Sequence, residues 1–345
     1  MSKRITIKDI AKHFNVHHST VSRALRNDKR VKEETRKLII SYAKKHGYQV
    51  NKSALHLRGE VKNMIAIVVP KVYQHFFSNI ISMISDLASS NGYVVSVFQT
   101  NESYKQEKAV INSIIQQNIA GVIASVSMET LSPSHFKKLI KFGIPLVFFF
   151  FFFEDIVVPK VTINNKEIIF QALNMLVGNG YKQIAYITGT KMVPLFRERQ
   201  NGYYEGIEAN HLKYSKVFEA SKYFSTSDGT QAVESLFSAP EKPDAIICDS
   251  HSITLGVLMK LQEKNINIPD QVGIIGHGAN EDNLVITPNI ASIVQPEKQL
   301  AFKSFELLHD IMLNNHKPEA RQVIIPATVI ERESCNPSKV KKLKN

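Results

Sequence analysis

The sequence predicts a small all-α helix-turn-helix head, followed by an α/β body made of two doubly wound parallel-sheet subdomains. Three observations lead to this fold class. Positive charge is concentrated in the first sixth of the 345-residue chain, apolar residues recur at helical spacing over residues 1–48, and strand-like and helical segments alternate from Asn63 onward. A chain of this length usually forms about two domains, and 43% of apolar residues is enough for large cores.

The charge distribution separates the head from the body. The net charge is +12, and residues 1–62 hold 16 basic and 5 acidic residues, which leaves the remainder at +1. A compact basic segment beside a neutral body is typical of proteins that bind a polyanion. A solvated basic tail is the alternative interpretation, and residues 336–345 at the other end are expected to be such a tail.

Composition argues against several other classes of protein. The 2 cysteines cannot form a disulfide framework, in keeping with a reducing compartment. The first residues lack the apolar stretch of a secretion signal. The longest apolar run, 144–153, is shorter than the roughly 20 residues that cross a bilayer. We therefore expect a cytoplasmic protein without a membrane segment.

Three short helices are predicted in the head. The first has apolar residues at helical spacing on one face, which are Ile7, Ile10, Ala11 and Phe14. A second helix starts near His17. A third carries apolar residues between Val31 and Tyr42 and ends before Gly47, a residue suited to a left-handed cap. Two short helices joined by a tight turn and supported by a third form a helix-turn-helix.

The second helix is the candidate DNA-reading element. Its polar side chains are expected to face outward, and they are His17, His18, Ser19, Ser22 and Arg23. Val21 and Leu25 are expected to face the core. Hydroxyl, imidazole and guanidinium groups reach base edges and phosphates in the major groove. For any one of these residues a solvated helix face is the alternative, but the whole set in so basic a head favours DNA contact.

An ordered motif runs through the head. It consists of Thr6-Ile7-Lys8-Asp9-Ile10-Ala11, Val16, Thr20-Val21-Ser22-Arg23-Ala24-Leu25, Val31, Thr35-Arg36, Gly47-Tyr48 and Asn51. It resembles the head of the LacI/GalR family of bacterial transcription regulators. The resemblance implies that His18, Ser19 and Arg23 read bases, and that Thr20 and Ser22 help to fix the helix on the DNA.

Three further residues of this region are candidate DNA contacts: His17, Arg30 and Asn51. His17 departs from the family pattern, because a serine commonly caps the recognition helix there and histidine is a poorer N-cap. We expect this departure to affect the preferred DNA sequence and not the fold.

Residues 49–62 are expected to form a hinge, since so short a segment is not a stable helix alone. The resemblance implies that two hinges of a dimer become helical on DNA. Leu57 matches the position that wedges into the minor groove, and Ala54 matches the small residue before it. Such a wedge unstacks a base step and bends the duplex. The alternative is a flexible linker whose Leu57 packs on the body.

The body shows strand-like apolar runs separated by helical stretches, with Gly92, Gly143 and Gly180 at helix-to-strand turns. Strands without polar alternation indicate parallel sheets covered on both faces. The predicted strands are 64–69, 93–98, 121–126, 145–150, 183–188, 244–248 and 271–275.

The resemblance to the LacI/GalR family continues through the body, which is also similar to periplasmic sugar-binding proteins. It is carried by Gly180-Tyr181, Arg199 with Gly202-Tyr203, Gly256, Val272-Gly273, Gln295-Pro296 and Arg332-Glu333-Ser334. It implies an effector-binding and dimerisation domain over 63–335. The N-subdomain would hold about 63–162 plus 294–323, and the C-subdomain about 163–293 plus 324–333. An effector cleft is expected between them, at the carboxyl ends of the strands.

The candidate effector-binding residues depart from the family pattern. Arg199 matches the family's effector-binding arginine. Ser250-His251 stands where the family often has Asn-Asp, and Gly276-His277-Gly278 stands where it has Gly-aromatic-Asp. Phe76 and Phe77 are candidates to stack on a sugar or base, with packing into the core as the alternative.

Two hypotheses follow from these departures. Histidines in place of carboxylates make the cleft less anionic, which favours a uronate or sugar phosphate over a neutral sugar. The family's aspartate after the fourth strand falls within Phe148–Phe153 here, and this run is expected to be one buried strand plus a loop. If exposed, the loop would suit an interface or promote aggregation.

The sequence therefore predicts a homodimeric DNA-binding transcription regulator of carbohydrate-related genes. Its expected partners are a palindromic operator and a small-molecule effector. We find no motif for catalysis and expect no enzyme activity, no cofactor and no metal site. The alternatives are a regulator whose cleft answers to a protein partner, and a solute-binding sensor.

Overall fold

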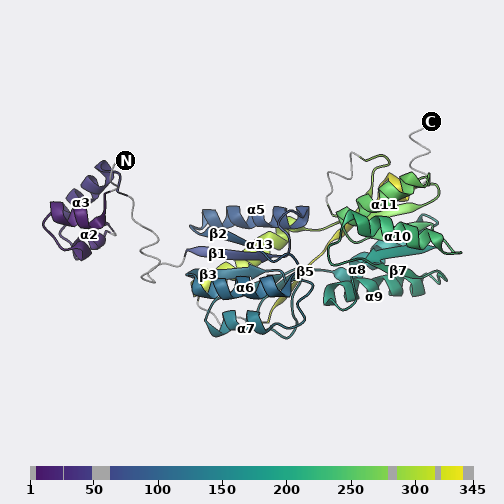
Figure 1. The fold of residues 1–345 in the computed structure, drawn as a ribbon, viewed down its shortest axis with the longest axis horizontal. Coiled ribbons are helices and arrows are strands. Elements are labelled where there is room, and N and C mark those ends of the chain that lie inside the picture. Colours follow the sequence, from purple (N-terminus) through teal and green to yellow (C-terminus); the bar gives the residue numbers. More distant parts are fainter. Residues whose placement is uncertain (1–4, 26, 49–62, 279–285, 315–319, 337–345) are drawn as a thin grey trace. The chain divides into compact units, whose positions relative to one another are not determined.

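The computed structural model describes residues 5–25, 27–48, 63–278, 286–314 and 320–336 (Figure 1). The chain divides into two compact units, Met1–Val61 and Lys62–Asn345. The first unit contains the head and the second contains the body. Within the described residues, the helices are all too short or too polar to cross a membrane.

The head is a bundle of three helices, α1 (Ile7–His13), α2 (His18–Leu25) and α3 (Glu33–Lys45). Thr6 caps α1 in a reciprocal pair with Asp9. Gly47 follows α3 in the left-handed region, with φ 64°, as its sequence position predicts. The small core is built from fully buried apolar side chains, which are Ile10, Val21, Ala24 and Ile39.

The body contains two sheets of six strands each (Figure 1). The first sheet has the order β11-β5-β4-β3-β1-β2, and all its strands are parallel. Its strands are β1 (Met64–Val69), β2 (Val94–Gln99), β3 (Ile119–Ala124), β4 (Leu146–Phe149), β5 (Lys160–Ile163) and β11 (Gln322–Ile325).

The second sheet has the order β12-β10-β9-β8-β6-β7. Its strands are β6 (Ile184–Thr188), β7 (Lys216–Glu219), β8 (Ala245–Cys248), β9 (Gly273–His277), β10 (Ala291–Val294) and β12 (Thr328–Ile330). The edge strand β12 pairs with β10 antiparallel, whereas the other neighbours are parallel. The sheet is therefore parallel except at this edge.

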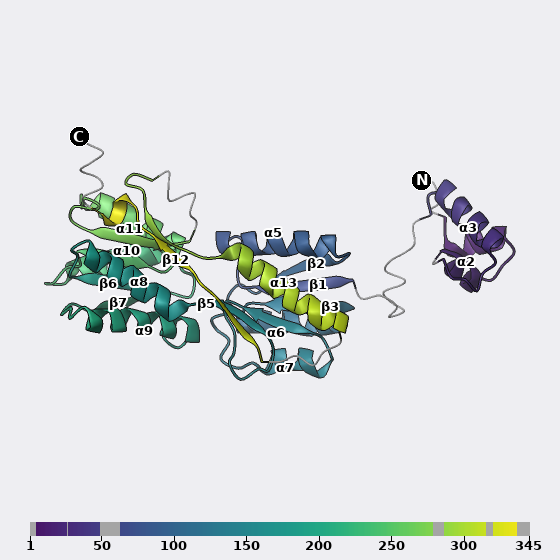
Figure 2. The same cartoon turned by 180° about the vertical axis from the view of Figure 1, so that it is seen from behind.

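Helices cover both faces of each sheet (Figure 2). The first sheet lies between α5 (His75–Ser90) with α13 (Glu297–Asn314) and α6 (Tyr104–Gln116) with α7 (Ser134–Lys141). The second lies between α8 (Asn165–Gly178) with α9 (Pro194–Ala209) and α10 (Thr226–Ser238) with α11 (His251–Glu263). Along β1, Ile65 and Ile67 face α5 and α13, and Ala66 and Val68 face α6 and α7. This is the doubly wound arrangement that the apolar strands predict.

The phenylalanine run 148–153 is a buried strand end followed by a loop, and none of its six side chains is exposed. Phe148 and Phe149 are fully buried in β4, and Phe151 is buried behind them. The other three phenylalanines are partly buried. Phe150 turns the chain out of the strand with φ 62°, in the left-handed region, and its ring contacts Phe76. The run therefore packs inside the body.

Candidate functional site

The helix α2 carries most of the candidate DNA-reading residues of the head. His17, His18 and Arg23 are exposed, and Ser19 and Thr20 are partly exposed. The rings of His17 and His18 lie 4.0 Å apart. The exposed arginine and imidazoles on α2 and directly before it can donate to phosphates and to the acceptors of base edges.

His17 occupies the position before α2 and acts as a cap. Its Nδ1 accepts from the backbone N–H of Ser19 at 3.4 Å and lies 2.9 Å from the Ser19 hydroxyl. One of the free amides at the start of α2 is thus partly satisfied by an imidazole in place of a hydroxyl.

Ser22 is buried, so the prediction that it faces outward is wrong. Only 8% of it is exposed, because it lies one residue after Val21 and three before Leu25, on the side of α2 that packs into the head. A role in direct DNA contact is therefore less well supported for Ser22 than for Arg23.

Arg30 is held by Asp28 across a short turn. Its guanidinium donates to both carboxylate oxygens, at 3.1 Å and 2.7 Å. The hydrogen bonds from Arg30 keep the pKa of Asp28 well below its usual value. The Arg30 side chain stays 75% exposed. The hinge candidates Asn51, Ala54 and Leu57 lie outside the described residues.

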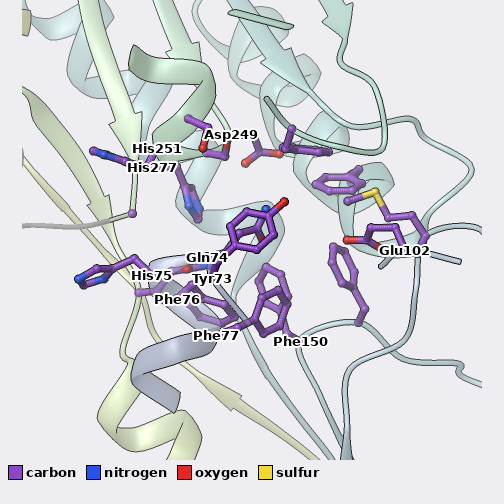
Figure 3. Close-up of a pocket in the computed structure, with 18 of the residues that line it drawn as sticks. Tyr73, Gln74, His75, Phe76, Phe77, Glu102, Phe150, Asp249, His251 and His277 are labelled. Atoms are coloured by element: carbon purple, nitrogen blue, oxygen red, sulfur yellow. Dashed lines mark hydrogen bonds between the residues drawn. The ribbon is translucent and has the colours of Figure 1, made fainter. Parts of the chain in front are cut away.

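A cavity of about 240 Å³ lies within the body, at the carboxyl ends of the strands of both sheets (Figure 3). It brings together all six candidate effector-binding residues, which are Phe76, Phe77, Arg199, Ser250, His251 and His277. These residues come from the first turn of α5, from α9, from the start of α11 and from the end of β9.

One side of this cavity is aromatic. Phe76 lies 4.5 Å from Phe150 and 5.2 Å from Phe77 between ring centroids. In Figure 3 these three rings lie on one side of the cavity, opposite Asp249, His251 and His277. Phe77 is only 2% exposed. It packs in the hydrophobic core and also lines the cavity.

A buried ion pair lies on the polar side of the cavity. The Arg199 Nη1 donates to Asp249 Oδ1 at 2.5 Å, and the Arg199 Nε donates to Asn165 Oδ1 at 2.9 Å. The Thr188 hydroxyl donates to the second oxygen of Asp249 at 2.5 Å. The ion pair is almost completely buried. Sequence reasoning missed Asp249, although a carboxylate directly after the apolar strand 244–248 was a signal that could have found it.

Among the described residues, three buried nitrogen atoms of the cavity lining have no hydrogen-bond partner. They are Arg199 Nη2, His277 Nε2 and Gln295 Nε2. Buried polar atoms are nearly always paired, so these atoms are candidates to bind a ligand or an ordered water. Gln295 was also missed as a site residue, because glutamine carries no charge or motif that marks it in a sequence.

On the polar side of the cavity, Arg199 is paired and His277 is neutral. Burial, with a smaller effect of Arg199, lowers the pKa of His277 well below its usual value, so this imidazole is neutral at pH 7. Arg199 is compensated by Asp249. The imidazole of His277 therefore adds no positive charge to the cavity, which weakens the prediction of a uronate or sugar phosphate as the ligand.

Two polar contacts join the two halves of the body. The Lys71 Nζ, beyond β1, donates to the Tyr223 carbonyl, beyond β7, at 2.7 Å. Lys222 forms an ion pair with Glu129, again between the two halves.

Glu102 lines the cavity and accepts a hydrogen bond from the Met128 amide at 2.8 Å. Burial raises the pKa of Glu102 to about 7.

The raised pKa of Glu102 makes a prediction about stability. The folded protein keeps a proton on Glu102 that the unfolded chain releases above about pH 4.5, so stability falls as pH rises from about 4.5 to about 7. Glu102→Gln should remove this loss and stabilise the protein at pH 8 by at most about 3 kcal/mol. Urea unfolding at pH 5 and pH 8 measures the difference, which should be small at pH 5. The exposed Glu208→Gln is the matched control, and an equal response of both variants to pH would contradict the prediction.

A second cavity of about 260 Å³ shares Met128, Phe150 and Phe151 with the first. Among the described residues, no side chain that lines it holds a buried polar atom without a partner. The described part of the chain also holds no group of three or more histidine, cysteine or carboxylate side chains that could bind a metal. The first cavity is therefore the stronger candidate for a ligand site.

Comparison with protein families assigns the two parts of the chain separately. Residues 6–51 match the bacterial regulatory proteins of the lacI family, and residues 173–335 match the periplasmic binding protein-like domain. The first match contains α1 to α3, and the second contains all six strands of the second sheet and the polar side of the cavity.

Comparison with whole proteins agrees with this assignment. The chain is 29% identical to the HTH-type transcriptional repressor CytR of Escherichia coli K12, over 90% of this chain and 91% of that protein. It is 25% identical to the catabolite control protein A of Priestia megaterium, over 96% of this chain and 99% of that protein. Its fold is similar to that of the lac repressor dimer bound to operator and the anti-inducer ONPF, with a TM-score of 0.83, 19% identity, and coverage of 97% and 100% of the two chains.

Proposed function

We propose that this chain, a member of the lacI family of bacterial regulatory proteins, represses genes of carbohydrate metabolism by binding a palindromic operator as a homodimer. A small molecule in the first cavity controls this binding. One observation carries the proposal: a basic helix-turn-helix with an open polar face is joined to a body whose cavity holds three unpartnered buried nitrogens. Such a regulator works in the cytoplasm, where its DNA is.

The DNA-binding part of the proposal rests on α2. His18, Ser19 and Arg23 contact base edges, and His17, Thr20 and Arg30 contact the phosphate backbone or position the helix. Arg23 is the strongest candidate, because it is exposed and its guanidinium can bind a guanine with two hydrogen bonds. In the hinge, Asn51 contacts the backbone, and Leu57, preceded by Ala54, wedges into the minor groove.

The exposed edge of the first sheet is evidence for the proposed dimer. Val94 and Val97 on the edge strand β2 are 54% and 41% exposed, and an exposed apolar edge is commonly covered by another chain. The division of the body that we propose places residues 63–162 and 294–323 in one subdomain and 163–293 and 324–333 in the other. These boundaries lie within one or two residues of the ends of β5, β10 and β11.

The effector part of the proposal rests on the geometry of the cavity. Its volume of about 240 Å³ is smaller than the roughly 300–1,000 Å³ that is usual for ligand sites, which suits a molecule with one or two rings. A sugar, a uronate or a sugar phosphate is the expectation from the sequence. Arg199, the one arginine or lysine among the described lining residues, is paired with Asp249, and His277 is neutral. This favours an uncharged ligand, since an anion would be buried without a free cation from these residues to compensate it.

The test is selection of DNA from a random duplex pool by the full-length protein, followed by titration of the selected sequence. Arg23→Ala should weaken binding to the selected sequence by about 1–3 kcal/mol and relax the preference at one base position. Deletion of residues 1–62 should abolish binding. The matched control is Lys37→Ala on α3, which removes one charge from the head at a residue already paired with Glu33.

Two results would contradict the proposal. One is retention of sequence-specific binding by the protein that lacks residues 1–62. The other is an equal loss of affinity for selected and random duplexes in Arg23→Ala, since that would indicate phosphate contact alone.

A further inference from the structure

Three consecutive residues at the start of α2 and directly before it contact one another through their side chains, and they are His17, His18 and Ser19. The His17 carbonyl accepts from the Thr20 amide at 2.8 Å, so His17 occupies the N-cap of the helix. Its imidazole lies 4.0 Å from the ring of His18 between centroids, and its Nδ1 lies 2.9 Å from the Ser19 hydroxyl. The His17 side chain therefore contacts both of the neighbours that are candidates to read bases.

The backbone decides where the protons of this group are. The Ser19 amide can only donate, and it does so to the same His17 Nδ1 at 3.4 Å. Nδ1 is therefore the nitrogen of the imidazole that carries no proton, and the ring proton is on Nε2. A ring nitrogen without a proton can only accept, so the Ser19 hydroxyl donates to it. Of the two bonds, the shorter one from the hydroxyl is the better formed.

This arrangement limits what Ser19 can recognise. A free serine hydroxyl either donates or accepts, because it rotates to suit its partner. The proton of the Ser19 hydroxyl is used by His17, so only the lone pairs of its oxygen remain for DNA. Phosphate oxygens only accept, and so do the N7, O6 and O4 atoms of the bases. The donors in the major groove are the exocyclic amino groups of adenine and cytosine.

We propose that His17 is a positioning residue that fixes Ser19 as a hydrogen-bond acceptor, so that Ser19 recognises the amino group of an adenine or a cytosine. This inference rests on the proposed function, because it requires α2 to lie in the major groove. Each base pair has one amino group and one carbonyl on its major-groove edge, and a free serine can bind either of them. With its proton used by His17, Ser19 distinguishes the two bases of a pair, which a serine alone does not.

Base analogues test which group Ser19 binds. The full-length protein first selects its sequence from a random duplex pool, and Ser19→Ala identifies the position to which Ser19 contributes. At this position adenine is replaced by purine, or cytosine by 2-pyrimidinone, which removes the amino group and keeps the carbonyl of the partner base. The unchanged protein should bind the analogue duplex about fivefold or more weakly, through one lost hydrogen bond. Ser19→Ala should bind the two duplexes equally.

A double-mutant cycle tests the role of His17. His17→Ser removes the imidazole acceptor but keeps a good N-cap, so α2 should remain folded. Loss of the amino group should then weaken binding by about twofold or less, because the Ser19 hydroxyl is free to donate to the carbonyl instead. In the Ser19→Ala background, His17→Ser should not change this ratio further. The matched control is His46→Ser, an exposed histidine at the end of α3, which should respond to the analogue as the unchanged protein does.

Two results on the selected sequence would overturn the inference. One is binding of the analogue duplex by the unchanged protein as tightly as the natural one. The other is a response of His17→Ser to the analogue that is as large as that of the unchanged protein. A selected sequence in which no position depends on Ser19 would overturn this inference alone and leave the proposed function standing. Failure of the full-length protein to select any sequence would overturn the proposed function and this inference with it.

Discussion

Arg199→Met should lower the free energy of unfolding of the body by about 3–5 kcal/mol, because it leaves Asp249 buried without its partner. The two side chains of this pair are 1% and 0% exposed. Methionine fills a similar volume, so the loss reports the uncompensated charge and not a cavity. The urea unfolding midpoint measures the effect.

The double variant Arg199→Met/Asp249→Leu separates charge from packing. It removes both charges together, and its stability should return to within about 1–2 kcal/mol of the original, since a buried ion pair is often replaceable by apolar groups. The matched control is Arg197→Met, an exposed arginine on the same helix, which should change stability by at most about 0.5 kcal/mol. If Arg199→Met proved as stable as this control, the ion pair would make no contribution to the stability of the body.

The second large effect is expected at Gly202, where α9 crosses α8. A Cβ added there would lie 2.0 Å from the backbone carbonyl oxygen of Lys166, far inside van der Waals contact. A backbone atom cannot rotate away as a side chain can, so the two helices would have to separate. Gly202→Ala should therefore destabilise the body by about 3 kcal/mol, as a strongly overpacked site does.

The same substitution in the partner helix provides the control. Gly178 ends α8, and a Cβ there would meet nothing within 4 Å. Gly178→Ala should stabilise the protein by about 0.4–1 kcal/mol, because alanine restricts the unfolded chain more than glycine does. Thermal unfolding of the two variants should move in opposite directions. A shift in the same direction for both would show that helix propensity, and not contact between α8 and α9, governs Gly202.

Most of the fold follows from local pattern. The predicted strands 64–69, 183–188 and 244–248 match β1, β6 and β8 to within one residue, because buried parallel strands are continuous apolar runs. The three helix-to-strand glycines, Gly92, Gly143 and Gly180, all have positive φ, as such turns require. The three helices of the head follow from spacing alone.

The strands that the sequence analysis missed are short or lie at the edges of the sheets. They are β5, β7, β10, β11 and β12, each of three or four residues. A run of four residues gives little periodic signal, and an edge strand such as β7 is only partly buried. Such segments become strands because their neighbours supply the hydrogen bonds.

Local pattern was therefore sufficient for the two-part organisation, for the exposed polar residues of α2 and for the residue types at the ends of the strands. It could not assign charge states or partners. The pairing of Arg199 with Asp249, the neutral state of His277, the burial of Ser22 and the internal position of Phe150 and Phe151 arise where segments far apart in the chain meet. A side chain's ionisation and exposure depend on every group packed around it, and those groups come together only when the sheets and helices are assembled.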